Sequence, residues 1–171
     1  MTLLERVVAL LDRADVPHAL IGAAALATAG VARSTFDIDL LVVSDLALRD
    51  STWAALTEAS VEIRRGDAED PLRGVVRIES GAERPVDVIV GKHAWQARAI
   101  ERAARHGSGP PVVLPRDLVL LKLYAGGTQD TWDVRELLRV CGDRLAQEVE
   151  ADLVAMPADM RARWNESRAG S

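Results

Sequence analysis

The run 36–43 constrains this chain most, because it has the character of a buried strand yet carries two aspartates. Apolar residues fill the run, whereas Asp is normally depleted from strands. Alternate side chains of a strand point to the same side, so Asp37 and Asp39 are predicted to share a face with their Cα atoms about 6.5–7 Å apart. Two like charges so placed repel each other unless a cation joins them, and a hard divalent metal ion is the simplest such cation.

A third carboxylate, Asp87, has the same setting in the apolar run 85–90. If its strand pairs beside the first, Asp87 joins Asp37 and Asp39 on one face. Three carboxylates from two neighbouring strands can hold two divalent ions about 3.5–4 Å apart, and we therefore expect Mg²⁺ as the cofactor, with Mn²⁺ as a substitute. Such a centre aligns a triphosphate and stabilises pyrophosphate as it leaves, because phosphate transfer needs mainly positioning and charge neutralisation.

A glycine turn precedes the acidic strand. The strand 18–21 is predicted to run into Gly22, where a helix of small residues opens and aims free backbone N–H groups at an anion. Gly22 and Ala23 are therefore candidate phosphate-binding residues, about 15 residues before Asp37. Arg33 lies on the loop between them, where it is either a contact for phosphate or acceptor or an ordinary surface charge.

The predicted fold class is α/β (α+β), with a mixed sheet of about five strands, flanking helices and a helical C-terminal part. Strands are predicted at 18–21, 36–43, 61–64, 75–78 and 86–90, with a short one at 112–114. Helices are predicted at 2–15, 23–29, a dozen residues from 44 or 45, 94–105, 115–123 and 130–168, the last with breaks at Gly142 and Pro157. We expect an α/β core over 1–115, a helical part over 116–168 and a disordered tail over 169–171.

Composition limits the classes of function. A net charge of −5 from 21 basic and 26 acidic residues gives no general attraction to nucleic acid or anionic membrane, although a local basic cleft stays open. The single cysteine, Cys141, excludes an intrachain disulfide and favours a reducing cytoplasm. Charged residues interrupt the N-terminal apolar run, so no signal peptide is predicted, and no apolar stretch approaches the roughly 20 residues of a membrane span.

These motifs, in this order, resemble the nucleotidyltransferase superfamily, which has the DNA polymerase β-like fold. The matching segments are Ile21-Gly22-Ala23, Thr35-Phe36-Asp37-Ile38-Asp39-Leu40 and Val86-Asp87-Val88. Residues 19–43 look most like small stand-alone nucleotidyltransferases of the AbiEii type and their relatives. A helix over 117–123 that carries Lys122, followed by Asp130-Thr131-Trp132-Asp133, adds to that likeness. The resemblance covers about residues 3–140.

The resemblance implies an Mg²⁺-dependent enzyme that moves a nucleoside monophosphate from an NTP to an acceptor hydroxyl. Asp37 and Asp39 would hold two metal ions, and Asp87 would complete one metal site and act as the general base. Lys122 would add positive charge at the triphosphate, although a lysine among leucines can also snorkel from a buried helix. Helix capping is the alternative role for Asp130 and Asp133, since acidic residues suit the start of a helix.

One departure from the family pattern leaves a second function open. Ala23 follows Gly22 where the family usually has Gly or Ser, so the chain lacks a hydroxyl that would bind phosphate. The alternative is a catalytically degenerate module that binds a nucleotide or another protein. A metal-dependent phosphohydrolase ranks lower, because the chain lacks the His and Asp ligands that such sites usually need.

If the chain is a nucleotidyltransferase, its sequence does not identify the acceptor. It is either tRNA or another cellular target of a toxin-type enzyme, whose partner would be a cognate antitoxin, or a small molecule such as an aminoglycoside.

Overall fold

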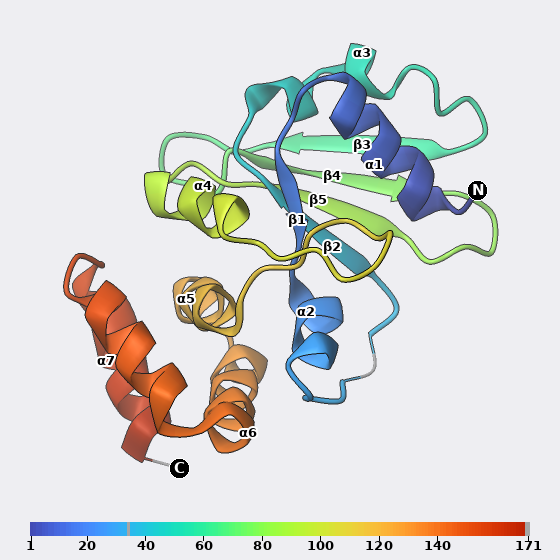
Figure 1. The fold of residues 1–171 in the computed structure, drawn as a ribbon. Helices are drawn as coiled ribbons and strands as arrows, with labels where there is room; N and C mark the ends of the chain where they lie inside the picture. The colour runs from blue at the N-terminus through green and yellow to red at the C-terminus, as the bar shows by residue number, and fades with distance from the viewer. Residues whose placement is uncertain (34, 170–171) are drawn as a thin grey trace. The chain divides into compact units, whose positions relative to one another are not determined.

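The computed structural model describes residues 1–33 and 35–169 (Figure 1). The chain divides into two compact units, Met1–Ala24 with Ser34–Val113 and Ala25–Arg33 with Leu114–Ser171. The sequence-based boundary between residues 115 and 116 stays a prediction. Of the predicted disordered tail, Ala169 ends the last helix, while residues 170 and 171 lie outside the described residues.

The first unit is built on a five-stranded sheet in the order β1-β2-β5-β4-β3 (Figure 1). The strands are β1 (His18–Leu20), β2 (Ile38–Val42), β3 (Ser60–Arg65), β4 (Gly74–Glu79) and β5 (Val86–Val90). The central strands β2 and β5 run parallel, and the other neighbouring pairs run antiparallel. The predicted mixed sheet is therefore confirmed.

One face of this sheet forms the core of the first unit. The helical elements of the unit are α1 (Leu3–Arg13), η1 (Asp45–Leu48), α3 (Asp50–Trp53) and α4 (Ala94–Glu101). Val76, Val86 and Val88 join one buried cluster with Leu3 of α1 and Leu48 of η1. Successive side chains of a strand alternate between faces. Arg77, which follows Val76, and Asp87, which lies between Val86 and Val88, therefore point to the opposite face, away from this cluster.

Several predicted elements of this unit differ from the structure; α4, for example, ends at Glu101, whereas a helix through residue 105 was predicted. The single helix predicted from residue 44 or 45 is split into η1 and α3, because Arg49 between them is extended, with φ −97° and ψ 130°. This break brings Trp53 back onto η1, where its Nε1 donates to the Ala47 carbonyl at 2.8 Å. The strand predicted at 112–114 forms only isolated bridges, from Val112 to Leu20 and to Ala104.

The second unit is helical, as predicted. Its helices are α5 (Pro115–Ala125), α6 (Thr128–Leu153) and α7 (Ala158–Ala169), and α2 (Gly22–Thr28) leads into it from the first unit. Pro115 stands at the start of α5, and Gly126, with φ +71°, ends it. Gly142 breaks α6 with φ 72° and ψ −164°, which confirms the predicted interruption. Among the described residues, no helix combines the length and the apolar character needed to cross a bilayer.

Candidate active site

A row of charged residues crosses the face of the sheet that points away from the core cluster, which we call the polar face. The register pairs Asp39 of β2 with Asp87 of β5, and the condition that the two acidic strands be neighbours is met. Asp87 is in turn opposite Arg77 of β4, and Arg77 is opposite Glu62 of β3. Residues that are partners in register lie on the same face, so four charged side chains from four strands stand side by side.

Asp37 is held differently from Asp39. β2 begins one residue after Asp37, not at Phe36 as predicted, so Asp37 belongs to the preceding loop. The Arg84 guanidinium fixes that loop by donating to the carbonyls of Thr35, Phe36 and Asp37 at 3.2, 3.1 and 3.1 Å. The Asp37 side chain is thus positioned by an arginine clamp rather than by the strand ladder.

Arg77 joins the carboxylates of this face, and the sequence did not single it out. Its Nη1 lies 3.2 and 3.0 Å from the two carboxylate oxygens of Asp87, and its Nη2 lies 3.4 Å from Asp37 Oδ1. Its Nε donates to Glu79 Oε1 at 2.8 Å. The hydrogen bond to Glu79 and the charge of Asp87 raise the pKa of Arg77, which stays a cation. The guanidinium therefore bridges two of the predicted metal ligands.

Burial raises the pKa of Asp87 above the usual value for an aspartate, and its side chain is only 17% exposed. The attraction of Arg77 opposes this shift, while the negative charges of Asp37 and Glu79 add to it. A carboxylate with a raised pKa is a stronger base, which suits the predicted role of Asp87 as a proton acceptor.

The glycine turn lies directly against Asp39. The Ile21 N–H donates to the Asp39 carbonyl at 3.0 Å, and Gly22 follows with φ +63° at the start of α2. A Cβ atom on Gly22 would lie 2.1 Å from Asp39 Oδ2. The missing side chain therefore gives the Asp39 carboxylate its place, and Ala23 is buried in the first turn. The phosphate-binding roles of Gly22 and Ala23 stay predictions.

We expect Gly22→Ala to lower the free energy of unfolding by at least about 2 kcal/mol, from backbone strain at positive φ and from the clash with Asp39. Gly81→Ala is the matched control, since Gly81 has φ +55° and no described atom would lie within 4 Å of a methyl group added there. That variant should lose only about 1 kcal/mol. Urea unfolding measures both, and equal losses would contradict the close approach of Asp39.

The other two candidate phosphate contacts, Arg33 and Lys122, lie in the second unit and share one carboxylate. Arg33 Nη1 is 2.6 Å and Lys122 Nζ is 2.7 Å from Asp133 Oδ2, and Asp133 is fully buried. Lys122 also pairs with Asp130 at 2.8 Å, and Asp130 accepts from the Gly127 N–H at 3.0 Å, which confirms a helix cap there. Ion pairing thus accounts for both cations, and their roles at a triphosphate stay predictions.

The chemistry of the polar face suits a hard divalent cation. Carboxylate oxygens are the preferred ligands of Mg²⁺, and Arg77 already shows positive charge held between Asp37 and Asp87. Within residues 1–33 and 35–169, no group of three His, Cys, Asp or Glu side chains is placed to hold a metal ion. The ligand roles of Asp37, Asp39 and Asp87 therefore stay predictions.

Solvent reaches the row through a shallow hollow of about 200 Å³ on the same face. Its lining residues are Glu62, Arg64, Val75, Arg77 and Asp87. A small ligand in this hollow would contact Asp87 directly.

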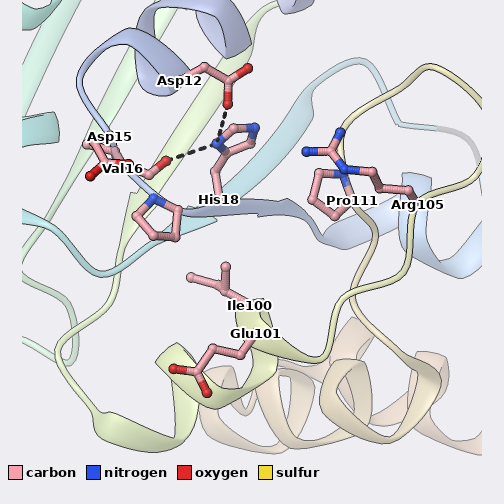
Figure 2. A pocket seen from close by; sticks show the side chains of 9 residues that line it. Asp12, Asp15, Val16, His18, Ile100, Glu101, Arg105 and Pro111 are labelled. Atoms are coloured by element: carbon pink, nitrogen blue, oxygen red, sulfur yellow. Dashed lines mark hydrogen bonds and ion pairs between the residues drawn. The ribbon is translucent and has the colours of Figure 1, made fainter.

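A second hollow of the first unit, of about 270 Å³, contains none of the predicted site residues (Figure 2). Its lining residues are Asp12, Asp15, Val16, Pro17, His18, Ile100, Glu101, Arg105 and Pro111. His18 is buried there, with its Nδ1 3.0 Å from the Val16 carbonyl and 4.0 Å from Asp12 Oδ1. These contacts tie the imidazole ring to α1 and to the segment between α1 and β1.

Comparison with solved structures identifies the fold of this chain. No family model and no curated protein sequence matches the chain. The solution structure of the antibiotic-resistance factor ANT(2″)-Ia is 15% identical with a TM-score of 0.55, over 97% of this chain and 91% of that one. The crystal structure of ANT(2″)-Ia in complex with adenylyl-2″-tobramycin is 19% identical with a TM-score of 0.56, over 95% of this chain and 97% of that one. The chain has the nucleotidyltransferase-type fold predicted from its sequence.

Proposed function

We propose that this protein transfers a nucleoside monophosphate from an NTP to an acceptor hydroxyl. The observation that carries the proposal is the register of β2 and β5, which puts Asp39 beside Asp87 on the polar face. The turn at Gly22 lies against the same Asp39 carboxylate. Carboxylates next to a helix start support the proposal, because phosphoryl transfer needs groups that bind a cation and groups that bind phosphate.

Each residue of the site has a part in this proposal. Asp37, Asp39 and Asp87 would hold a divalent cation, which would supply positive charge to balance the triphosphate and the departing pyrophosphate. The backbone N–H groups of Gly22 and Ala23 bind phosphate oxygens, for which no serine hydroxyl is needed. Asp87 accepts the proton of the acceptor hydroxyl, and its raised pKa supports this role.

The charge of the polar face favours a cationic acceptor. Five acidic residues share this face or its edge with three arginines; they are Asp37, Asp39, Glu62, Glu79 and Asp87, against Arg64, Arg77 and Arg84. Net negative charge attracts a polyamine-like small molecule and repels RNA. The ANT(2″)-Ia crystal structure contains adenylyl-2″-tobramycin. We therefore propose an aminoglycoside-like acceptor, while an RNA target with a cognate antitoxin stays the alternative.

Calorimetry tests the donor half of the proposal. We expect one or more NTPs to bind wild-type protein in the presence of Mg²⁺, and this binding to be lost in the double variant Asp37→Asn/Asp39→Asn. The variant should keep the far-ultraviolet circular dichroism of the wild type. If folded wild-type protein binds no NTP, the degenerate module becomes the better description.

Labelled nucleotide tests the acceptor half. The protein is incubated with each α-labelled NTP, Mg²⁺ and either tobramycin or total tRNA. Label on tobramycin is the expected result, and label on tRNA alone would move the assignment to a toxin-type enzyme.

A further inference from the structure

The bridging arginine of the polar face is fixed by its strand. Arg77 and Asp87 are direct partners in the antiparallel register of β4 and β5, so the two side chains leave the sheet side by side. Glu79, two residues along the same strand, holds the Arg77 Nε at 2.8 Å. The guanidinium therefore reaches Asp87 and Asp37 from an anchored position, with contacts of 3.0 and 3.4 Å.

An arginine anchored in this way restricts what else the carboxylates can bind. The guanidinium donates to both oxygens of Asp87, so both oxygens that would complete a metal site already have a cationic partner. A divalent ion bridging Asp37 and Asp87 would meet the guanidinium at short range, and like charges repel strongly there. Arginine cannot relieve this repulsion by losing its proton, because its pKa lies far above neutral pH.

We propose that Arg77 takes the place of one metal ion, so that this site binds a single divalent cation and Arg77 supplies the remaining positive charge. The inference rests on the proposed function and concerns the same site. One divalent ion together with Arg77 neutralises the three carboxylates Asp37, Asp39 and Asp87. Two divalent ions together with Arg77 leave an excess of two positive charges before any phosphate arrives. The negative charge of Glu79 changes this count of charges little, because its side chain is 54% exposed and its charge is screened by solvent.

Counting bound Mn²⁺ on the full chain tests the proposal without measuring activity. The free Mn²⁺ signal in electron paramagnetic resonance is followed as Mn²⁺ alone is titrated into wild-type protein, Arg77→Gln and Arg77→Met. We expect one ion per wild-type chain and two ions per chain in both variants, because each substitution removes the positive charge of Arg77. Gln and Met also keep a long side chain at this position, so packing changes little. Arg73→Gln is the matched control, since Arg73 pairs with Asp45 instead, and it should still bind one ion.

The outcomes separate this proposal from the proposed function. Two ions in the wild type, with NTP binding intact, would overturn the role of Arg77 and leave nucleotidyl transfer standing. One ion in every folded variant would also overturn it. No Mn²⁺ and no NTP binding by folded wild-type protein would remove both proposals together. If the Arg77 variants fail to fold by circular dichroism, the wild-type count still decides between one ion and two.

Discussion

Asp39→Asn is expected to reduce nucleotidyl transfer by about a thousandfold while the protein stays folded. Asn has nearly the shape of Asp, so the close contact with the Gly22 turn survives, but the negative charge that attracts a cation is gone. Without that cation the charge of the departing pyrophosphate is unbalanced in the transition state. The measurement is the initial rate of label transfer from the NTP to its acceptor, with Mg²⁺ in excess.

The control for this prediction is Asp50→Asn, which makes the same chemical change at a side chain that is 92% exposed in the first turn of α3. Its rate should equal that of the wild type. Wild-type activity in Asp39→Asn would exclude Asp39 as a metal ligand. Loss of activity in both variants would show that the assay reports folding or purity instead of the site.

Asp133→Ala is expected to lower the free energy of unfolding by about 3 kcal/mol and the melting temperature by about 6–12 °C. Asp133 is fully buried and accepts from Arg33 and Lys122, and the Lys122 side chain is only 11% exposed. Removing the carboxylate leaves a mostly buried ammonium with one remaining partner, Asp130. Thermal and urea unfolding, followed by circular dichroism, measure the effect.

A graded series makes this second prediction specific. Asp130→Ala should cost less than Asp133→Ala, because the Asp130 side chain is 19% exposed and Lys122 keeps its stronger partner. Asp143→Ala changes an exposed residue that directly follows the break at Gly142, and it should cost no more than about 1 kcal/mol. Equal losses in all three variants would mean that removal of a negative charge near a helix start, and not loss of the buried ion pairs, dominates.

The sheet could be predicted from the sequence because its strands carry a strong local signal. Short apolar runs such as 86–90 alternate between core and surface and are bounded by turn residues, and the structure confirms them as strands. The segment after residue 44 was harder. Its residues favour a helix locally, but the tertiary contact between Trp53 and the Ala47 carbonyl accompanies a break at Arg49 that no local propensity indicates.

The candidate site was only partly predictable for a related reason. Asp39 and Asp87 stand out because carboxylates are rare within apolar strands. Arg77 does not, since an arginine in a strand normally points to solvent, and only the register of β4 with β5 shows that it meets Asp87. The pairing of Arg33 with Asp133 spans 100 residues of sequence, which lies beyond any pattern of spacing.

The strand register also protects the site against errors in folding. Asp87 stands between Val86 and Val88, both fully buried in the core. If β5 paired with its neighbours one residue out of step, the carboxylate would enter the core and the valines would face water. The burial of these valines and the position of Asp87 therefore depend on the same register, so a pairing that buries the valines also puts the carboxylate on the polar face.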